Sequence, residues 1–401
     1  MKIKICIFAA VTTLACALPS CRDEAPYVFN PYDQQVFIDW SDLFESYWNG
    51  MNYSYVFWDV DPTDWDQVYA DYKPRFEGLE FNVAADSVKA VELFTELTST
   101  LIDHHYGLII KDETGGWYAL ISPSDAETKQ RDYYHAKIDA NQLFNNMLAW
   151  EESGRVTELS GTFNTEPGGF IFYTCLIDNS IVYLRLNSFE LTTHLRYENV
   201  ARALDQYYDF INELPDLKGI IIDTRSNGGG STIDEHFILT PLLNEPHTFG
   251  YTRTKLGMGR LDYTPWIPLT LNPREDVEKE YVTRDVSNIP IVGLIDIHSL
   301  SMAEITPMAI QELPNGIIIG ERSYGGHGPL NNDINAFYTG ELENSAFRIY
   351  TSTSMTKRLD GKCYEGIGII PDIEVFYNDE EFKHGNDLQL ERAIQYIKTG
   401  H

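Results

Sequence analysis

The chain has 401 residues, 43% of them hydrophobic and 22% charged, which is an ordinary balance for a globular protein with a sizeable core. Its formal net charge of −30 is unusual and argues against binding to nucleic acid or adsorption on anionic lipid, because both partners are negatively charged. The length predicts two or three lobes.

The N-terminus predicts an export signal that takes no part in the fold. A basic start precedes a short apolar stretch, residues 5–18, which is too short and too interrupted for a transmembrane helix. Leu18-Pro19-Ser20-Cys21 resembles a bacterial lipobox, although its proline leaves plain signal cleavage open. We expect a signal over residues 1–20 and a lipid on Cys21. The protein would then be an exported lipoprotein of the outer membrane or the cell surface, held to the membrane by this anchor alone.

The next segment, residues 21–124, predicts an N-terminal helical domain. Large apolar residues recur there at helical spacing, and a glycine-containing turn separates two short β-prone runs. The predicted elements are helices over 36–48 and 85–102, a helix cap at Thr63 or Asp64, and a hairpin that pairs 107–111 with 117–121.

From residue 181 onward strands and helices alternate. The strands are almost continuous apolar runs, as expected for strands covered on both faces, and they predict an α/β core over 181–376. Residues 125–180 predict a β-rich connecting region without a clear PDZ signature, and 377–401 a C-terminal helix packed on the core. The predicted elements are strands over 181–186, 219–223, 290–295 and 316–319, and helices over 142–150, 197–214 and 387–398.

Two segments of this core carry chemistry. Ser301 lies in a turn between a buried strand and a helix, where its hydroxyl is exposed and the helix N-terminus can stabilise negative charge. Serine is also a common helix N-cap, and Glu304 could complete a capping box, so this position alone is more simply structural. Upstream, a strand ends in Asp223 and Arg225 and runs into three glycines that let the backbone approach a ligand. Together the segments indicate a hydrolase that acts by acyl transfer.

These segments resemble the serine peptidase family of the C-terminal processing proteases, the tricorn protease core and interphotoreceptor retinoid-binding protein. Residues 299–304 (SLSMAE) resemble a family run of alternating serine and alanine ending in glutamate, whose middle serine attacks. Residues 223–229 (DTRSNGG) and 365–372 (EGIGIIPD) resemble two further family elements. The resemblance implies a ClpP/crotonase-like α/β core and a serine peptidase acting on peptides or unfolded protein segments, with no cofactor and no metal.

The base that activates Ser301 depends on the branch of the family. In the processing-protease branch a lysine lies 25 residues after the nucleophile, but this position is Gly326 here. The tricorn-like branch takes a histidine from an aspartate-glycine-histidine element, which residues 103–105 (DHH) resemble, so the resemblance implies His105 as the base. A capped helix end is the structural alternative for this pair of histidines. His327 is a rival base.

The remaining roles also follow from the resemblance. Glu365 is expected to support the histidine or its network. The oxyanion hole is expected to combine the Met302 N–H with an N–H of Gly228 or Gly229. Asp223 and Arg225 are expected to brace the glycine loop without touching the substrate.

Two alternatives from other functional classes stay open. One is an inactive peptide-binding protein, which the departures at Gly326 and Pro307 favour, because a proline within the helix after Ser301 costs about 3 kcal/mol. The other is a carrier of hydrophobic ligands, which the aromatic content of 13% favours. The oligomeric state is not predicted.

Overall fold

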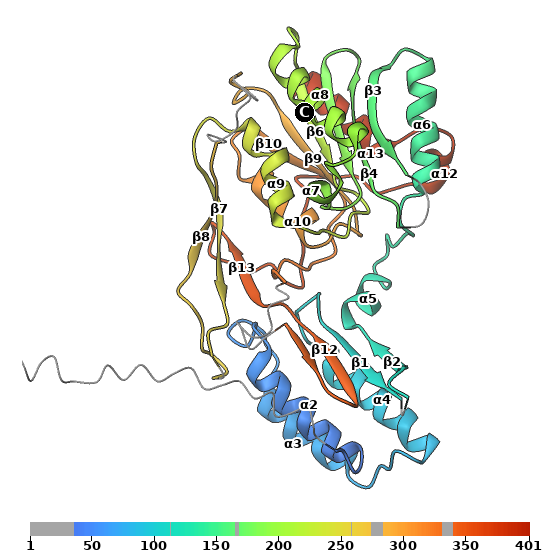
Figure 1. Cartoon of the computed structure of the whole chain (residues 1–401), viewed down its shortest axis with the longest axis vertical. Coiled ribbons are helices and arrows are strands. Elements are labelled where there is room, and N and C mark those ends of the chain that lie inside the picture. The colour runs from blue at the N-terminus through green and yellow to red at the C-terminus, as the bar shows by residue number, and fades with distance from the viewer. Residues whose placement is uncertain (1–35, 113, 165–167, 258, 274–283, 331–339) are drawn as a thin grey trace, which may run out of the picture.

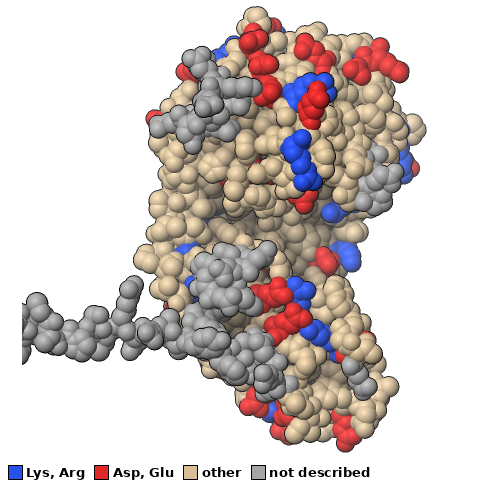
Figure 2. Space-filling model, in the orientation of Figure 1, with Lys and Arg blue, Asp and Glu red and all other residues tan. Residues whose placement is uncertain are grey.

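The protein is described by a computed structural model over residues 36–112, 114–164, 168–257, 259–273, 284–330 and 340–401. Two lobes meet at a narrower waist, and Figure 2 shows the surface hollowed on one side between them. Cys21 and the predicted export signal lie outside the described residues. Within the described ranges, no helix is both long and apolar enough to cross a membrane.

The upper lobe of Figure 1 is built on a seven-stranded sheet. Five neighbouring strands run parallel, and two more extend the sheet in antiparallel pairing. Every residue of β6 and β9 is buried, because helices cover both faces of the sheet, as the apolar runs predicted. In spatial order the strands are β14 (Ile373–Glu374), β10 (Gly316–Gly320), β9 (Ile291–Ile295), β6 (Gly219–Asp223), β5 (Ile181–Leu186), β4 (Ile171–Ile177) and β3 (Val156–Phe163).

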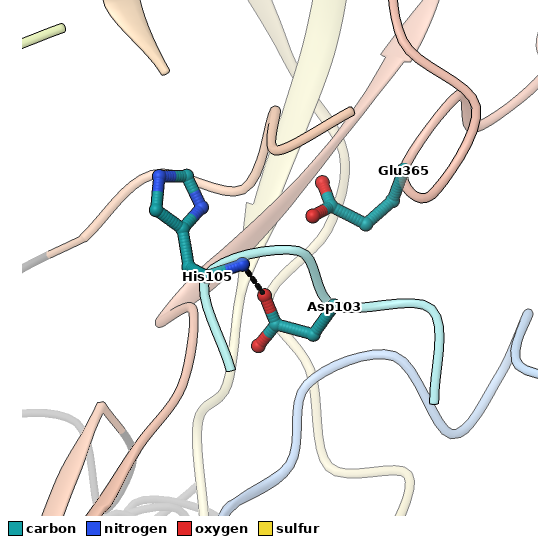
Figure 3. A group of neighbouring side chains, drawn as sticks. All are labelled: Asp103, His105 and Glu365. Atoms are coloured by element: carbon teal, nitrogen blue, oxygen red, sulfur yellow. Dashed lines mark hydrogen bonds between the residues drawn. The ribbon is translucent and has the colours of Figure 1, made fainter. Parts of the chain in front are cut away.

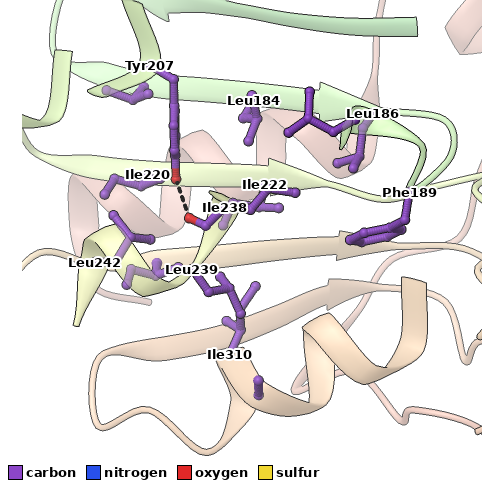
Figure 4. Close-up of a cluster of buried hydrophobic side chains, with 14 of the residues drawn as sticks. Leu184, Leu186, Phe189, Tyr207, Ile220, Ile222, Ile238, Leu239, Leu242 and Ile310 are labelled. Carbon is purple, nitrogen blue, oxygen red and sulfur yellow. Dashed lines mark hydrogen bonds between the residues drawn. The ribbon is translucent and has the colours of Figure 1, made fainter. Parts of the chain in front are cut away.

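Helices form a layer on each face of this sheet. On one face α8, α9 and α10 bury a large apolar cluster, in which the Tyr207 hydroxyl donates to the carbonyl of Ile238 at 3.1 Å (Figure 4). On the other face α6 and α13 bury a second cluster. The fold is therefore the α/β class that the sequence predicted. The helices of this lobe are α6 (Ala140–Glu152), α7 (Leu191–His194), α8 (Glu198–Glu213), α9 (Thr232–Ile238), the 3-10 turn η1 (Thr240–Leu242), α10 (Met302–Gln311), α12 (Asp379–Lys383) and α13 (Leu388–Thr399).

Helix α10 continues through Pro307, although a proline cannot donate the hydrogen bond of a helix interior. The acceptor that would lose its partner is the carbonyl of Ala303, four residues earlier. The Thr224 hydroxyl lies 3.5 Å from that oxygen, but its shorter bond, of 3.2 Å, goes to the carbonyl of Leu294. The carbonyl of Ala303 thus shares this donor only weakly.

The lower lobe packs helices on an antiparallel sheet of order β11-β12-β1-β2. Phe347 of β12 is fully buried and packs edge-on against Tyr47 of α2, so a segment from late in the chain completes the core of this lobe. The elements are α2 (Trp40–Ser54), α3 (Trp65–Phe76), α4 (Ala84–Thr98), β1 (Gly107–Lys111), β2 (Trp117–Ile121), α5 (Pro123–Thr128), β11 (Glu341–Glu343) and β12 (Phe347–Tyr350).

A three-stranded sheet of order β13-β7-β8 runs alongside both lobes (Figure 1). It comprises β13 (Ser354–Arg358), β7 (His247–Thr254) and β8 (Ile267–Leu271). Its far end is tied to the helices of the lower lobe, because Arg260 pairs with Asp66 at 2.6 Å. The sequence analysis did not predict this sheet.

The lobes differ from the predicted domain boundaries in two places. The boundary at residue 181 divides a continuous sheet, because the fully buried β4 pairs with β5 along its whole length. The segment 21–124 is not an independent helical domain, because β1 pairs with β12 more than 200 residues later. Local sequence patterns do not show which strands pair across the chain. Both boundaries were therefore predicted from changes in composition alone.

Candidate active site

Ser301 lies where the chain turns from β9 into α10, and its backbone is strained. Its φ of 61° and ψ of −120° fall in a region that residues with a Cβ rarely adopt. The glycine loop after β6 approaches it so closely that a Cβ on Gly229 would lie 2.5 Å from the Cβ of Ser301. Strain at a residue in such a contact is the kind of observation that points to a functional position.

Two backbone N–H groups beside Ser301 are available for an oxyanion. Among the described residues, no acceptor pairs with the N–H of Gly228 or with that of Met302, the first residue of α10. The N–H of Gly229 is instead engaged, because it donates to the side-chain oxygen of Asn227 at 2.7 Å. The structure therefore favours Gly228 over Gly229 as the partner of Met302.

Arg225 and Asp223 hold the start of the glycine loop from below. The fully buried guanidinium donates to both carboxylate oxygens of Asp223 and to both of Asp387, the cap of α13. Burial alone would raise the pKa of Asp223, but Arg185 and Arg225 lower it to about 2. This ion-pair network lies beneath the sheet edge, so it braces the loop.

Glu304 fastens the second glycine loop to the Ser301 turn. Its carboxylate accepts the N–H groups of Gly325 and Gly326 at 2.8 and 2.7 Å, and that of Ser301 at 3.3 Å. Burial raises the pKa of Glu304 to about 7, and the surrounding donors offset part of this rise. Its predicted supporting role is thus a direct bond between nucleophile turn and loop.

The ring of His105 fills the space above Gly326, the position where the processing-protease branch carries its lysine. A Cβ at residue 326 would lie 3.1 Å from Cε1 of His105. The carbonyl of Gly326 accepts the N–H of Ser301 at 3.1 Å, which places the ring close to the nucleophile turn. A side chain at 326 would therefore compete with His105 for the same space.

His105 has the electrostatic state of a resting general base. Its Nδ1 lies 3.5 Å from the Ser352 hydroxyl, which donates to Asp103 at 2.9 Å, and its buried Nε2 has no partner among the described residues. Burial, and then the neighbouring His327 and His104, lower the pKa of His105 to about 3. The imidazole is therefore neutral at pH 7 and able to accept a proton.

Glu365 supports the segment that carries His105 without bonding to its ring. One carboxylate oxygen accepts the N–H of His104 at 3.0 Å, and the other accepts those of His327 and Gly328 at 2.8 Å each. Figure 3 shows its carboxylate beside His105 and Asp103. Burial, and then the charge of Asp103, raise the pKa of Glu365 well above its ordinary value. Glu365 thus ties the histidine turn to the glycine loop.

Asp103, His105 and Glu365 are also the described residues that could offer ligands to a metal, with one atom from each within 4.8 Å of the others. The oxygens of Asp103 already accept two bonds from Ser352 and the N–H of His105, and those of Glu365 accept three N–H groups. Burial raises the pKa of Asp103 to about 6. Because their oxygens already accept these hydrogen bonds, the carboxylates of Asp103 and Glu365 act as groups that position the histidine.

The rival base, His327, is buried in the same region and lines the same cavity. Burial lowers its pKa to about 3, so it is neutral as well. Neither of its ring nitrogens makes a hydrogen bond to a described residue, and Nε2 lies 3.9 Å from Glu304. His327 therefore has a carboxylate nearby, beyond hydrogen-bonding distance, but no counterpart of the Ser352 hydroxyl that links the ring of His105 to Asp103.

The site faces a cavity of about 430 Å³, whose lining includes Ser301, His105, Gly228 and Met302.

Three residues in or behind this cavity were not identified as site residues from the sequence: Asp103, Ser352 and Glu235. Asp103 belongs to the motif that contains His105, and its position there was the available signal. Ser352 follows β12, far from every motif, and carried no signal.

Comparisons with known proteins find similar peptidases. Residues 180–375 match the family described as Peptidase family S41. The tricorn protease of Thermoplasma acidophilum is 26% identical over 196 residues, 49% of this chain and 15% of the relative. A carboxy-terminal-processing protease of Bartonella bacilliformis is 29% identical over 216 residues, 53% of this chain and 43% of the relative. The chain thus spans less than half the length of these curated relatives.

Solved structures show the same fold. A protein from Parabacteroides merdae, described provisionally as a peptidase, superposes with a TM-score of 0.65 at 22% identity, covering 90% of this chain and 98% of its own. Mature CPAF superposes with a TM-score of 0.55 at 11% identity, covering 90% of this chain and 96% of its own. At such identities the likeness establishes the fold alone.

Proposed function

We propose that this chain is a serine peptidase with Ser301 as nucleophile and His105 as general base. Residues 180–375 match peptidase family S41, and the tricorn and carboxy-terminal-processing proteases are similar in sequence. One observation carries the proposal. A strained serine, two N–H donors with no acceptor among the described residues and a neutral, partly buried imidazole line a single cavity.

The proposed reaction follows the geometry of these groups. The Ser301 hydroxyl attacks the scissile carbonyl while its proton passes to Nε2 of His105. The N–H groups of Gly228 and Met302 stabilise the oxyanion, each contributing roughly 3–4 kcal/mol. His105 then returns the proton to the leaving amine, and water hydrolyses the acyl-enzyme by the same steps. Asp103 acts through Ser352 to orient the imidazole.

The proposed substrates are peptides or unfolded protein segments. Ser301 comes from the α/β lobe and His105 from the turn after α4 in the lower lobe, so a substrate that reaches both must bind where the two lobes meet. The predicted lipid on Cys21 would hold the enzyme at the outer membrane or cell surface, and this anchor remains a proposal.

Intact-mass measurement after fluorophosphonate treatment tests the proposed nucleophile. The wild type should gain one adduct, Ser301→Ala none, and Ser99→Ala, which alters an exposed helix-end serine, one. Turnover of an unfolded protein such as reduced casein should follow the same order. A folded wild type that neither labels nor cleaves would overturn the proposal and favour a binding protein.

A further inference from the structure

The cavity beside Ser301 contains a buried carboxyl group that the proposed reaction does not use. Glu235 lies on α9, lines the cavity and is only 4% exposed. Its Oε1 has no partner within hydrogen-bonding geometry among the described residues, and its interaction with the Thr306 hydroxyl on α10 lowers the pKa of the carboxyl without supplying a charge to pair with it. Buried polar atoms are nearly always paired, so an unpaired oxygen at a cavity wall calls for a partner from outside the protein.

The position of the cavity identifies which part of a substrate would supply that partner. Ser301, Gly228 and Met302 line it together with Glu235. A carbonyl held by these three groups must direct the side chain of its own residue into the same cavity. The cavity therefore receives the side chain on the acyl side of the scissile bond.

The walls and the charge of the cavity define the chemistry of that side chain. Phe249, Leu269 and Ile305 provide apolar surface that suits an aliphatic stem. Glu235 is the one carboxylate among the described lining residues. Burial raises its pKa to about 8, and the Thr306 hydroxyl, which carries no charge, offsets only part of this rise. A carboxyl group in this setting gains most from a cation delivered by the ligand.

We propose that Glu235 selects substrates with a lysine or arginine side chain on the acyl side of the scissile bond. The aliphatic stem packs along the apolar walls, and the charged end meets the carboxylate of Glu235, whose proton leaves to solvent as the ion pair forms. The formal charge of −30 favours the approach of such substrates. This inference rests on the proposed peptidase function and adds the substrate class to it.

Turnover of matched peptides tests the selection. Fluorogenic peptides that differ only at the residue before the scissile bond, lysine or its neutral analogue norleucine, should be cleaved by the wild type with kcat/KM at least about tenfold higher for lysine. Glu235→Gln keeps the shape of the neutral carboxyl and should lose this ratio. Glu213→Gln, an exposed change on α8, should keep it. An unchanged ratio in Glu235→Gln, or a wild type that favours norleucine or glutamine, would overturn the inference.

Binding without turnover separates this inference from the proposed function. Calorimetry of Ser301→Ala with the two peptides should show at least about tenfold tighter binding of the lysine peptide, and Ser301→Ala/Glu235→Gln should show equal binding. If the wild type cleaves nothing but this binding difference is present, the peptidase proposal fails and the subsite stands. If cleavage occurs but no difference is found in either assay, the subsite fails and the peptidase stands.

Discussion

Replacement of Gly229 by alanine should disable the active site although it removes no functional group. The φ of Gly229 is +89°, where an L-residue costs roughly 1–2 kcal/mol. The new Cβ would also lie 2.5 Å from the Cβ of Ser301 and 2.9 Å from the N of Met302. The loop must therefore move away from the nucleophile and carry the Gly228 N–H with it. Loss of one oxyanion donor costs about 3–4 kcal/mol, so kcat/KM should fall by roughly 10²–10³-fold.

Two further alanine variants separate the possible causes of that loss. Gly154→Ala carries the same backbone penalty, with φ +77° but no atom within 4 Å of the new Cβ, and should change stability alone. Gly78→Ala, with φ +79° and likewise no atom within 4 Å of the new Cβ, repeats this control at a position outside the site and should retain kcat/KM within about threefold. Peptide turnover and fluorophosphonate labelling rates, with unfolding measured in parallel, provide the assay. A folded Gly229→Ala protein with activity near the wild type would refute the contact with Ser301.

Three other substitutions test the network behind the site. Arg225→Leu removes the cation of Asp387 and one of the two cations of Asp223, which keeps Arg185, and should lower the free energy of unfolding by about 3–5 kcal/mol. Arg75→Leu, at an exposed ion pair, should cost about 0–1 kcal/mol, and equal losses in urea unfolding would contradict this account. Glu365→Gln keeps the shape of the side chain but turns an N–H₂ group toward backbone N–H donors. It should reduce peptide turnover at least about tenfold while the protein stays folded, and unchanged turnover would contradict the role of Glu365. Burial raises the pKa of Glu235 in the folded protein to about 8, above its value in the unfolded chain. As pH rises from about 5 to 8, the free energy of unfolding of the wild type should therefore fall relative to that of Glu235→Gln, by roughly 1.4 kcal/mol per pH unit. A difference that does not depend on pH would contradict the burial of this carboxyl.

The sequence predicted the α/β core because its strands are buried on both faces. Such strands are continuous apolar runs, and β5, β6, β9 and β10 were each identified within one residue of their observed ends. The turn at Ser301 and the glycine loop after β6 were visible for a similar reason, since both lie between a strong strand signal and a helix. Local sequence patterns therefore predicted the two parts of the site that directly follow core strands, the Ser301 turn and the glycine loop.

The parts that depend on contacts between distant segments could not be predicted. Ser352 reaches His105 because β12 pairs with β1, and the sequence of neither strand indicates which strand it pairs with. From the sequence, Glu235 would be expected to face solvent on a short helix. In the structure it is buried where α9 packs against α10. The N–H of Gly229 is engaged by the Asn227 side chain, an orientation that the loop sequence does not disclose.

The labelling rate of Ser301 in His105→Ala and His327→Ala tests the central claim most directly. Both imidazoles are neutral at pH 7 and line the same cavity, His327 buried and His105 partly buried, but only His105 has Ser352 and Asp103 behind it. Intact-mass kinetics with a fluorophosphonate should show a loss of roughly 10²–10⁴-fold in His105→Ala and a rate within about tenfold of the wild type in His327→Ala. The reverse order would move the base to the glycine loop and contradict the account.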